Sequence, residues 1–127
     1  PLFQAAEESL VGAPIRMMSA ATAAALQKFD AATAIQRRRE NFAFLHERLH
    51  TTFPLSVAED DVPMVYPYVV EDATLRSRLI SNKIYVAKYW PGLSSVANAL
   101  AERIIPLPID QRYDSEDMER TIGVVRG

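Results

Sequence analysis

Residues 104–113 read Ile-Ile-Pro-Leu-Pro-Ile-Asp-Gln-Arg-Tyr, an apolar stretch that passes directly into a polar turn. Pro106 and Pro108 favour an extended backbone, because proline cannot donate the hydrogen bond that a helix interior requires. Asp114 follows as a candidate N-cap, and the acids in the next residues, Ser-Glu-Asp-Met-Glu, complement the positive end of a helix dipole. The stretch therefore predicts a strand, a polar turn and a closing helix.

A second extended segment, Val62–Val70, is rich in valine and tyrosine and poor in helix signals. Pro63 and Pro67 lie four residues apart, so both missing N–H groups face the same edge of the strand. We expect this strand to pair mainly through its other edge and to lie at the edge of a sheet.

Between these two segments the pattern alternates between helix and strand. Asp72 is a candidate cap for a helix that ends near Asn82, and Ile84–Trp90 predicts a third strand. Ser94 or Ser95 is a candidate cap for a further helix before residue 104.

The first fifty residues carry helical signals. Phe3–Val11 predicts a short helix that Gly12 stops, and Ser19 is a candidate N-cap for an alanine-rich helix. Apolar side chains then recur at helical spacing from Asp30 to about His50, which predicts a long amphipathic helix.

The order of these elements predicts an α/β (α+β) fold in which a small three-stranded sheet packs with helices. A long helical segment, residues 1–53, leads into an α/β region, residues 54–127. We interpret residues 1–127 as a single domain, because 127 residues with 49% apolar side chains suffice for one core.

The composition argues against several classes of function. With 14 basic and 16 acidic residues and a net charge of −2, the chain has no field strong enough to hold a polyanion, so nucleic acid is not an expected partner. The absence of cysteine excludes disulfides and thiol catalysis and is consistent with a cytoplasmic location. No apolar run approaches the roughly 20 residues that span a bilayer, so no membrane partner is expected.

Four stretches, taken in order, carry a family resemblance. They are Met17-Met18-Ser19 ahead of the alanine-rich helix, Arg39-Glu40-Asn41 in the long helix, Ile84–Gly92, and Leu107–Tyr113 followed by Asp117-Met118. Together they resemble the C-terminal small domain of the DegT/DnrJ/EryC1/StrS group of fold-type I pyridoxal-phosphate (PLP) enzymes, mostly aminotransferases of sugar nucleotides. The resemblance implies that this chain forms the substrate-side wall of the active site in a full-length PLP-dependent aminotransferase.

The resemblance also implies what this chain lacks. PLP chemistry needs a lysine that holds the cofactor and a phosphate cradle, which in the family belong to the large domain upstream. Lys28, Lys83 and Lys88 lie in no segment similar to the family's cofactor-lysine loop. We therefore expect this chain to bind no cofactor and to be inactive alone. The parent is expected to be a homodimer that contains PLP and takes a keto-sugar nucleotide or similar small substrate, with glutamate as amino donor.

Tyr89, Trp90 and Arg112 are the candidate substrate-binding residues, and none is assigned a catalytic role. Tyr89 stands where family members often place a His or Tyr, and the Tyr89-Trp90 pair is suited to packing against a sugar or nucleobase. Arg112 follows a strand in a polar turn and is suited to binding a carboxylate or phosphate through two parallel hydrogen bonds. In the alternative interpretation, Trp90 fills the core and Arg112 pairs locally with Asp110 or Asp114.

Three other features are interpreted as structural. Lys88 is a potential nucleophile among aromatics, but its stem is expected to pass over neighbouring apolar side chains. Arg37-Arg38-Arg39 spans about 200° of a helix and makes no stripe for phosphates. His46 and His50 share a helical face, yet no adjacent acid completes a convincing metal site, so no metal is expected.

Two main functional interpretations remain open, besides a weaker third in which the Arg37–Arg39 helix belongs to a nucleic-acid module. The chain is either a domain severed from its large domain or a freestanding small α/β protein-interaction or dimerisation module. The missing initiator methionine before Pro1 fits a segment of a longer chain as well as a processed start. A severed domain is expected to expose an apolar surface around its early helices, whereas a freestanding module should be polar or paired there.

Overall fold

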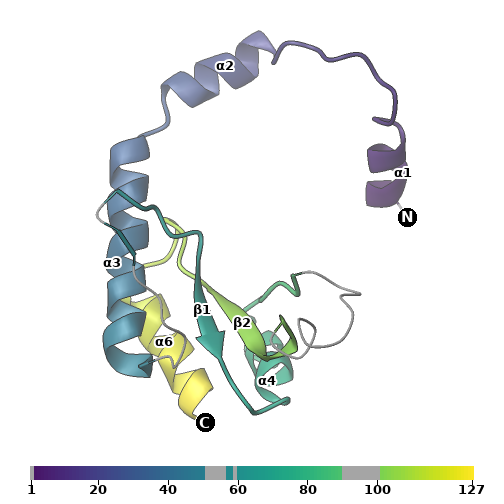
Figure 1. The fold of residues 1–127 in the computed structure, drawn as a ribbon. Helices are drawn as coiled ribbons and strands as arrows, with labels where there is room; N and C mark the ends of the chain where they lie inside the picture. The colour runs from purple at the N-terminus through teal and green to yellow at the C-terminus, as the bar shows by residue number, and fades with distance from the viewer. Residues whose placement is uncertain (1, 51–56, 59, 90–100) are drawn as a thin grey trace. The chain divides into compact units, whose positions relative to one another are not determined.

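Two units make up the computed structural model, which describes residues 2–50, 57–58, 60–89 and 101–127 (Figure 1). Pro1–Asp30 is the first unit and Ala31–Gly127 is the second, and each is described by itself. Among the described residues no helix is both long enough and apolar enough to cross a bilayer. The helix predicted after Ser94 or Ser95 lies outside the described residues, apart from residues 101–103, which are helical. The single-domain interpretation stays a prediction.

The first unit contains the helices α1 (Leu2–Glu8) and α2 (Ala20–Gln27). Gly12 follows α1 with a left-handed backbone, φ +74°, which glycine adopts readily because it has no Cβ. The Ser19 hydroxyl oxygen accepts a hydrogen bond from the Thr22 backbone nitrogen at 3.1 Å. The predicted N-cap of α2 is therefore confirmed. No residue of either helix is buried.

The second unit carries the α/β part of the fold. Its elements are α3 (Ala31–Leu49), β1 (Val65–Val69), α4 (Leu75–Ser81), β2 (Ile104–Pro108) and α6 (Ser115–Arg126). Helix α3 packs against β1 and α6, and α4 packs against α6, so that α3 and α6 lie side by side in Figure 1. The mixed α/β class, the long amphipathic helix and the closing helix are confirmed.

The antiparallel pair of β1 and β2 keeps its prolines away from the shared edge. Pro67 lies opposite Pro106, and Pro108 follows two residues later. Hydrogen-bonded and non-hydrogen-bonded pairs alternate along such a ribbon. The bond from the Val70 nitrogen to the Arg103 oxygen, 3.0 Å, therefore places all three prolines at non-hydrogen-bonded positions. Their nitrogen atoms face the outer edges of the ribbon, as predicted for Pro67.

The predicted third strand, Ile84–Trp90, is wrong in its described part. Residues 84–89 form no ladder, and the sheet in the described part of the chain has two strands. Ile84 lines the same small cavity as Pro108, so the segment begins beside β2. The outer edge of β2 offers no N–H at Pro106 or Pro108, and a ladder there would lack those donors.

Arg76 of α4 bonds to the backbone of this segment instead. Its guanidinium donates to the backbone oxygens of Ala87 at 2.7 Å and Val86 at 3.4 Å. The same group donates to the backbone oxygen of Ile104, the first residue of β2, at 3.3 Å. One side chain thus joins residues 86–87 to the start of β2.

The core of the second unit draws on α3, the ribbon, α4 and α6. Its most deeply buried large side chains are Tyr66, Leu45, Leu75, Leu79, Leu107, Ile109 and Met118. The Tyr66 ring meets the Phe42 ring edge-on, with 5.1 Å between centroids, and its hydroxyl lies 3.3 Å from Nδ1 of His46. Because Leu107 and Ile109 are both fully buried, the end of β2 is fixed in the core.

The two predicted acidic caps have different outcomes. The Asp114 carboxylate accepts from the backbone nitrogens of Glu116 and Asp117, and the Asp117 carboxylate accepts from the Asp114 backbone nitrogen. This reciprocal capping box confirms the predicted start of α6. Asp72 instead accepts from the backbone nitrogen and hydroxyl of Thr74, so it forms a turn that begins two residues before the N-cap position.

Candidate functional site: the polar turn after β2

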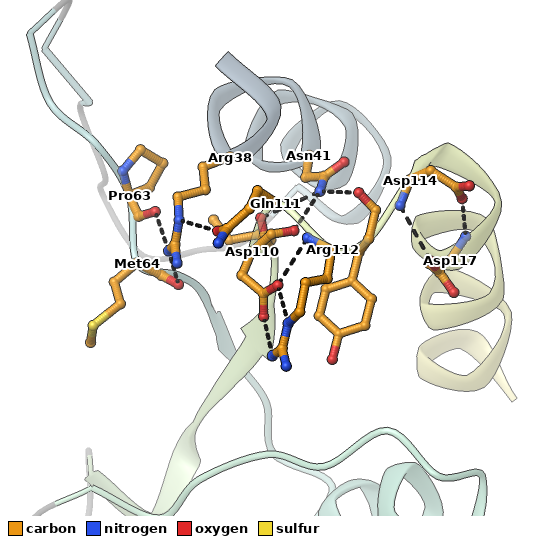
Figure 2. Close-up of polar contacts among 11 residues, drawn as sticks. Arg38, Asn41, Pro63, Met64, Asp110, Gln111, Arg112, Asp114 and Asp117 are labelled. Carbon is orange, nitrogen blue, oxygen red and sulfur yellow. Dashed lines mark hydrogen bonds and ion pairs between the residues drawn. The ribbon is translucent and has the colours of Figure 1, made fainter. Parts of the chain in front are cut away.

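Residues 110–113, here called the polar turn, join the end of β2 to α6 (Figure 2). The Tyr113 backbone nitrogen donates to the Asp110 backbone oxygen at 3.1 Å. The Arg112 backbone nitrogen donates to the Asp110 carboxylate at 3.0 Å, a bond of the kind by which aspartate side chains stabilise turns. The polar turn therefore has a defined backbone conformation.

The Arg112 side chain pairs with Asp110, as the alternative interpretation predicted. Its Nε donates to Oδ1 and its Nη2 donates to Oδ2 of Asp110, both at 2.8 Å. The Arg112 side chain is 75% exposed, whereas that of Asp110 is 18% exposed. The carboxylate thus holds one edge of the guanidinium, and the edge that includes Nη1 has no hydrogen-bond partner among the described residues.

Electrostatics strengthen this pair. The hydrogen bond from Arg112 lowers the pKa of the Asp110 carboxyl below its ordinary value, with a smaller lowering from the charge of Arg38. The bond to Asp110 and the carboxylate charge raise the pKa of Arg112 above its ordinary value. Both groups are therefore charged at neutral pH.

Removing the arginine is expected to raise the pKa of Asp110. In Arg112→Gln, carbon-detected NMR titration of the Asp110 carboxyl should give a value closer to the ordinary one of about 3.9, since the largest cause of the lowering is lost. Because the folded pKa is depressed, the pair stabilises the fold above about pH 4, and this contribution is lost as pH falls through the folded pKa. Arg120→Gln on α6 is the control and should leave Asp110 unchanged. An unchanged Asp110 in Arg112→Gln would refute the pairing.

Two side chains of α3 contact the polar turn, and the sequence had not indicated either contact. Asn41 is 3% exposed, and its Nδ2 lies within 3.1–3.3 Å of the backbone oxygens of Ile109, Asp110 and Tyr113. Arg38 donates from Nε to the Gln111 side-chain oxygen at 3.2 Å. Figure 2 shows both side chains reaching from α3 toward the turn.

The structure does not bring Tyr89 to Arg112. Trp90 lies outside the described residues. Tyr89 is half-buried and follows Lys88, whose ammonium nitrogen lies 2.7 Å from the Glu102 carboxylate. Tyr89 therefore lies toward the start of β2, whereas Arg112 follows the end of that strand. The substrate-binding role of all three residues stays a prediction.

Charged side chains also gather in a groove of about 270 Å³ at the start of β2. Its polar lining includes Glu71, Asp72, Arg76, Lys88, Glu102 and Arg103. Lys88 forms an ion pair with Glu102, and Arg103 forms one with Glu71. The charges of the groove are therefore largely paired with one another, and the Lys88 amine is engaged by a carboxylate.

The basic run of α3 has local partners, and His46 lies beside the Tyr66 hydroxyl. Arg37 lies 3.7 Å from Glu40, and Arg39 donates to the Asp61 backbone oxygen at 3.0 Å. Arg38 donates to the backbone oxygens of Pro63 and Met64, besides its bond to Gln111. In the part of the chain that the structure describes, no group of three or more potential metal ligands occurs.

Comparison with known proteins extends the fold assignment. No protein-family model matches the chain, and no curated protein matches its sequence. Among solved structures, the sugar aminotransferase CalS13 from Micromonospora echinospora matches with a TM-score of 0.61 and 19% sequence identity. The match covers 76% of this chain and 31% of that one. The chain therefore shares the fold of one part of a sugar aminotransferase and spans about a third of that protein's length.

Proposed function

We propose that this chain is the C-terminal domain of a PLP-dependent aminotransferase of the DegT/DnrJ/EryC1/StrS group, acting on a sugar nucleotide in the cytoplasm. The observation that carries the proposal is the fold shared with a sugar aminotransferase over 76% of this chain. The order of the family-like stretches in the sequence supports it independently. A shared fold alone does not determine the substrate, so the activity must be tested.

The exposed apolar surface of the first unit supports the proposal that a further domain covers it. Large apolar side chains are more than half exposed throughout this unit, namely Leu2, Phe3, Leu10, Val11, Ile15, Met17, Met18, Leu26 and Phe29. Apolar surface of this extent is unusual for a soluble monomer and typically marks an interaction site. We assign its cover to the large domain of the same polypeptide, in a homodimeric parent.

Neither Lys83 nor Lys88 offers a free amine in a setting that fits a PLP site. Lys88 is paired with Glu102, and Lys83 ends a helical turn with a left-handed backbone, φ +64°. In the proposed parent, PLP held by the large domain supplies the electron sink for amino transfer. This chain supplies substrate contacts.

Arg112 is the residue to which we assign substrate binding, with Tyr89 and Trp90 as aromatic neighbours of the substrate. Asp110 holds one edge of the guanidinium and leaves the Nη1 edge exposed. A carboxylate or phosphate oxygen is the natural ligand of such an edge, because both groups accept parallel hydrogen bonds from arginine. The phosphates of a sugar nucleotide and the carboxylate of glutamate both meet this requirement.

The test is to express the complete reading frame that contains this chain. We expect bound PLP by absorbance and glutamate-dependent amination of keto-sugar nucleotides. Arg112→Gln should raise KM about tenfold with little change in kcat, the loss of roughly 1.4 kcal/mol of uniform binding. A reading frame whose start codon lies immediately before Pro1, and which therefore encodes no PLP lysine upstream, would reject the proposal. Self-association of the 127-residue protein would then favour the dimerisation module.

A further inference from the structure

Asn41 occupies a buried position from which it contacts three backbone oxygens of the polar turn and its flank. The distances from Nδ2 are 3.3 Å to Ile109, 3.3 Å to Asp110 and 3.1 Å to Tyr113. An amide nitrogen carries two hydrogens, so at least one is shared between two oxygens. All three partners are acceptors, which fixes the amide orientation with nitrogen toward the turn.

These contacts enclose the turn from both ends. Ile109 and Asp110 lie where the chain leaves β2, and Tyr113 lies where it approaches α6. Arg112, the residue whose orientation matters for an anion, is between the contacted positions and makes no bond to Asn41. Because Asp110 both contacts Asn41 through its backbone and holds the Arg112 guanidinium through its carboxylate, the route from Asn41 to Arg112 has one intermediate residue.

We infer that Asn41 is a positioning residue for Arg112: it sets the conformation of the polar turn and, through Asp110, the direction of the guanidinium. The substrate-binding consequence rests on the proposed function. The geometric part does not, since it concerns only the contacts within this chain.

Position 41 requires a side chain that donates hydrogen bonds. A carboxylate in Asn41→Asp would direct two acceptor oxygens at backbone oxygens and remove both donors, while Asn41→Ala would remove the donors without adding charge. Asn41→Ser keeps one shorter donor. A residue that only fills the core would tolerate these changes in proportion to lost packing, whereas a positioning residue should alter the turn itself.

The pKa of Asp110 reports the turn conformation, because its lowering comes chiefly from the Arg112 hydrogen bond. In the folded 127-residue protein, Asn41→Ala should raise this pKa toward the ordinary value, as measured by NMR titration of the carboxyl carbon. Leu79→Ala, a buried change on α4 remote in sequence from the turn, is the control for lost stability and should leave the pKa unchanged. Where Asn41→Ala does not fold, Asn41→Ser is measured and should shift the pKa in the same direction.

A destabilised but folded Asn41 variant with an unchanged Asp110 pKa would overturn the inference and make Asn41 a packing residue. In the complete enzyme, Asn41→Ala should raise KM by about the same tenfold as Arg112→Gln, and the double variant should raise it little further. Independent, multiplicative effects would also overturn it. If neither single variant changes KM while the Asp110 pKa moves, the proposed substrate-binding role of Arg112 fails and the geometric inference stands.

Discussion

Leu107→Ala should lower the free energy of unfolding of this protein by about 2–5 kcal/mol, the usual range for a buried leucine. Leu107 is 0% exposed and lies opposite Tyr66 in the ribbon, so truncation would leave a cavity that neighbouring side chains fill only in part. Stabilities of small domains lie near 5–15 kcal/mol, so the change is a large fraction of the total. Urea denaturation followed by circular dichroism measures it.

Ile80→Ala is the matched control for this prediction, because it removes a side chain of the same size from an exposed position on α4. Ile80 is 43% exposed, so its truncation should cost well under half as much as that of Leu107. Equal losses at the two positions would contradict the placement of β2 in the core.

Arg76→Ala should lower the free energy of unfolding by about 1.5–3 kcal/mol, the range for hydrogen bonds to a charged group. The larger effect is expected to be local. Once the guanidinium no longer holds the backbone oxygens of Val86 and Ala87, amide hydrogens of residues 84–89 should exchange faster than in the unaltered protein, with a smaller increase in β2. Hydrogen exchange with mass spectrometry resolves the two segments.

Arg37→Ala is the control for the loss of an arginine. The Arg37 guanidinium pairs only with Glu40 among the described residues, at 3.7 Å on an exposed helix surface, and should contribute less than about 1 kcal/mol. Unchanged exchange of residues 84–89 in Arg76→Ala would mean that other contacts hold the segment that carries Tyr89.

Local signals in the sequence predicted the helices well. Ser19 and Asp114 both cap the helices that follow them, because an N-cap depends on its own side chain and the next three backbone nitrogens. The prediction of a third strand was wrong because a strand needs a partner strand with free backbone donors. Pro106 and Pro108 were visible in the sequence, but which edge of β2 they face depends on the register with β1.

In the candidate site, too, the local contacts could be predicted from the sequence and the long-range contacts could not. Arg112 and its local partner Asp110 are two residues apart, and the sequence already offered that pairing as the alternative. Asn41 was quoted only as part of a family-like stretch. Its role depends on contacts with residues 68 to 72 positions later in the chain, which no periodicity within α3 indicates.

The outward-facing prolines of the ribbon affect the way in which this protein would aggregate. An open strand edge with a full row of donors is a template on which other chains add strands and grow fibrils. Pro67 on β1 and Pro106 and Pro108 on β2 interrupt those rows on both sides. Without the proposed large domain, this chain should therefore cluster reversibly through exposed side chains rather than form amyloid, and thioflavin binding should stay low as concentration rises.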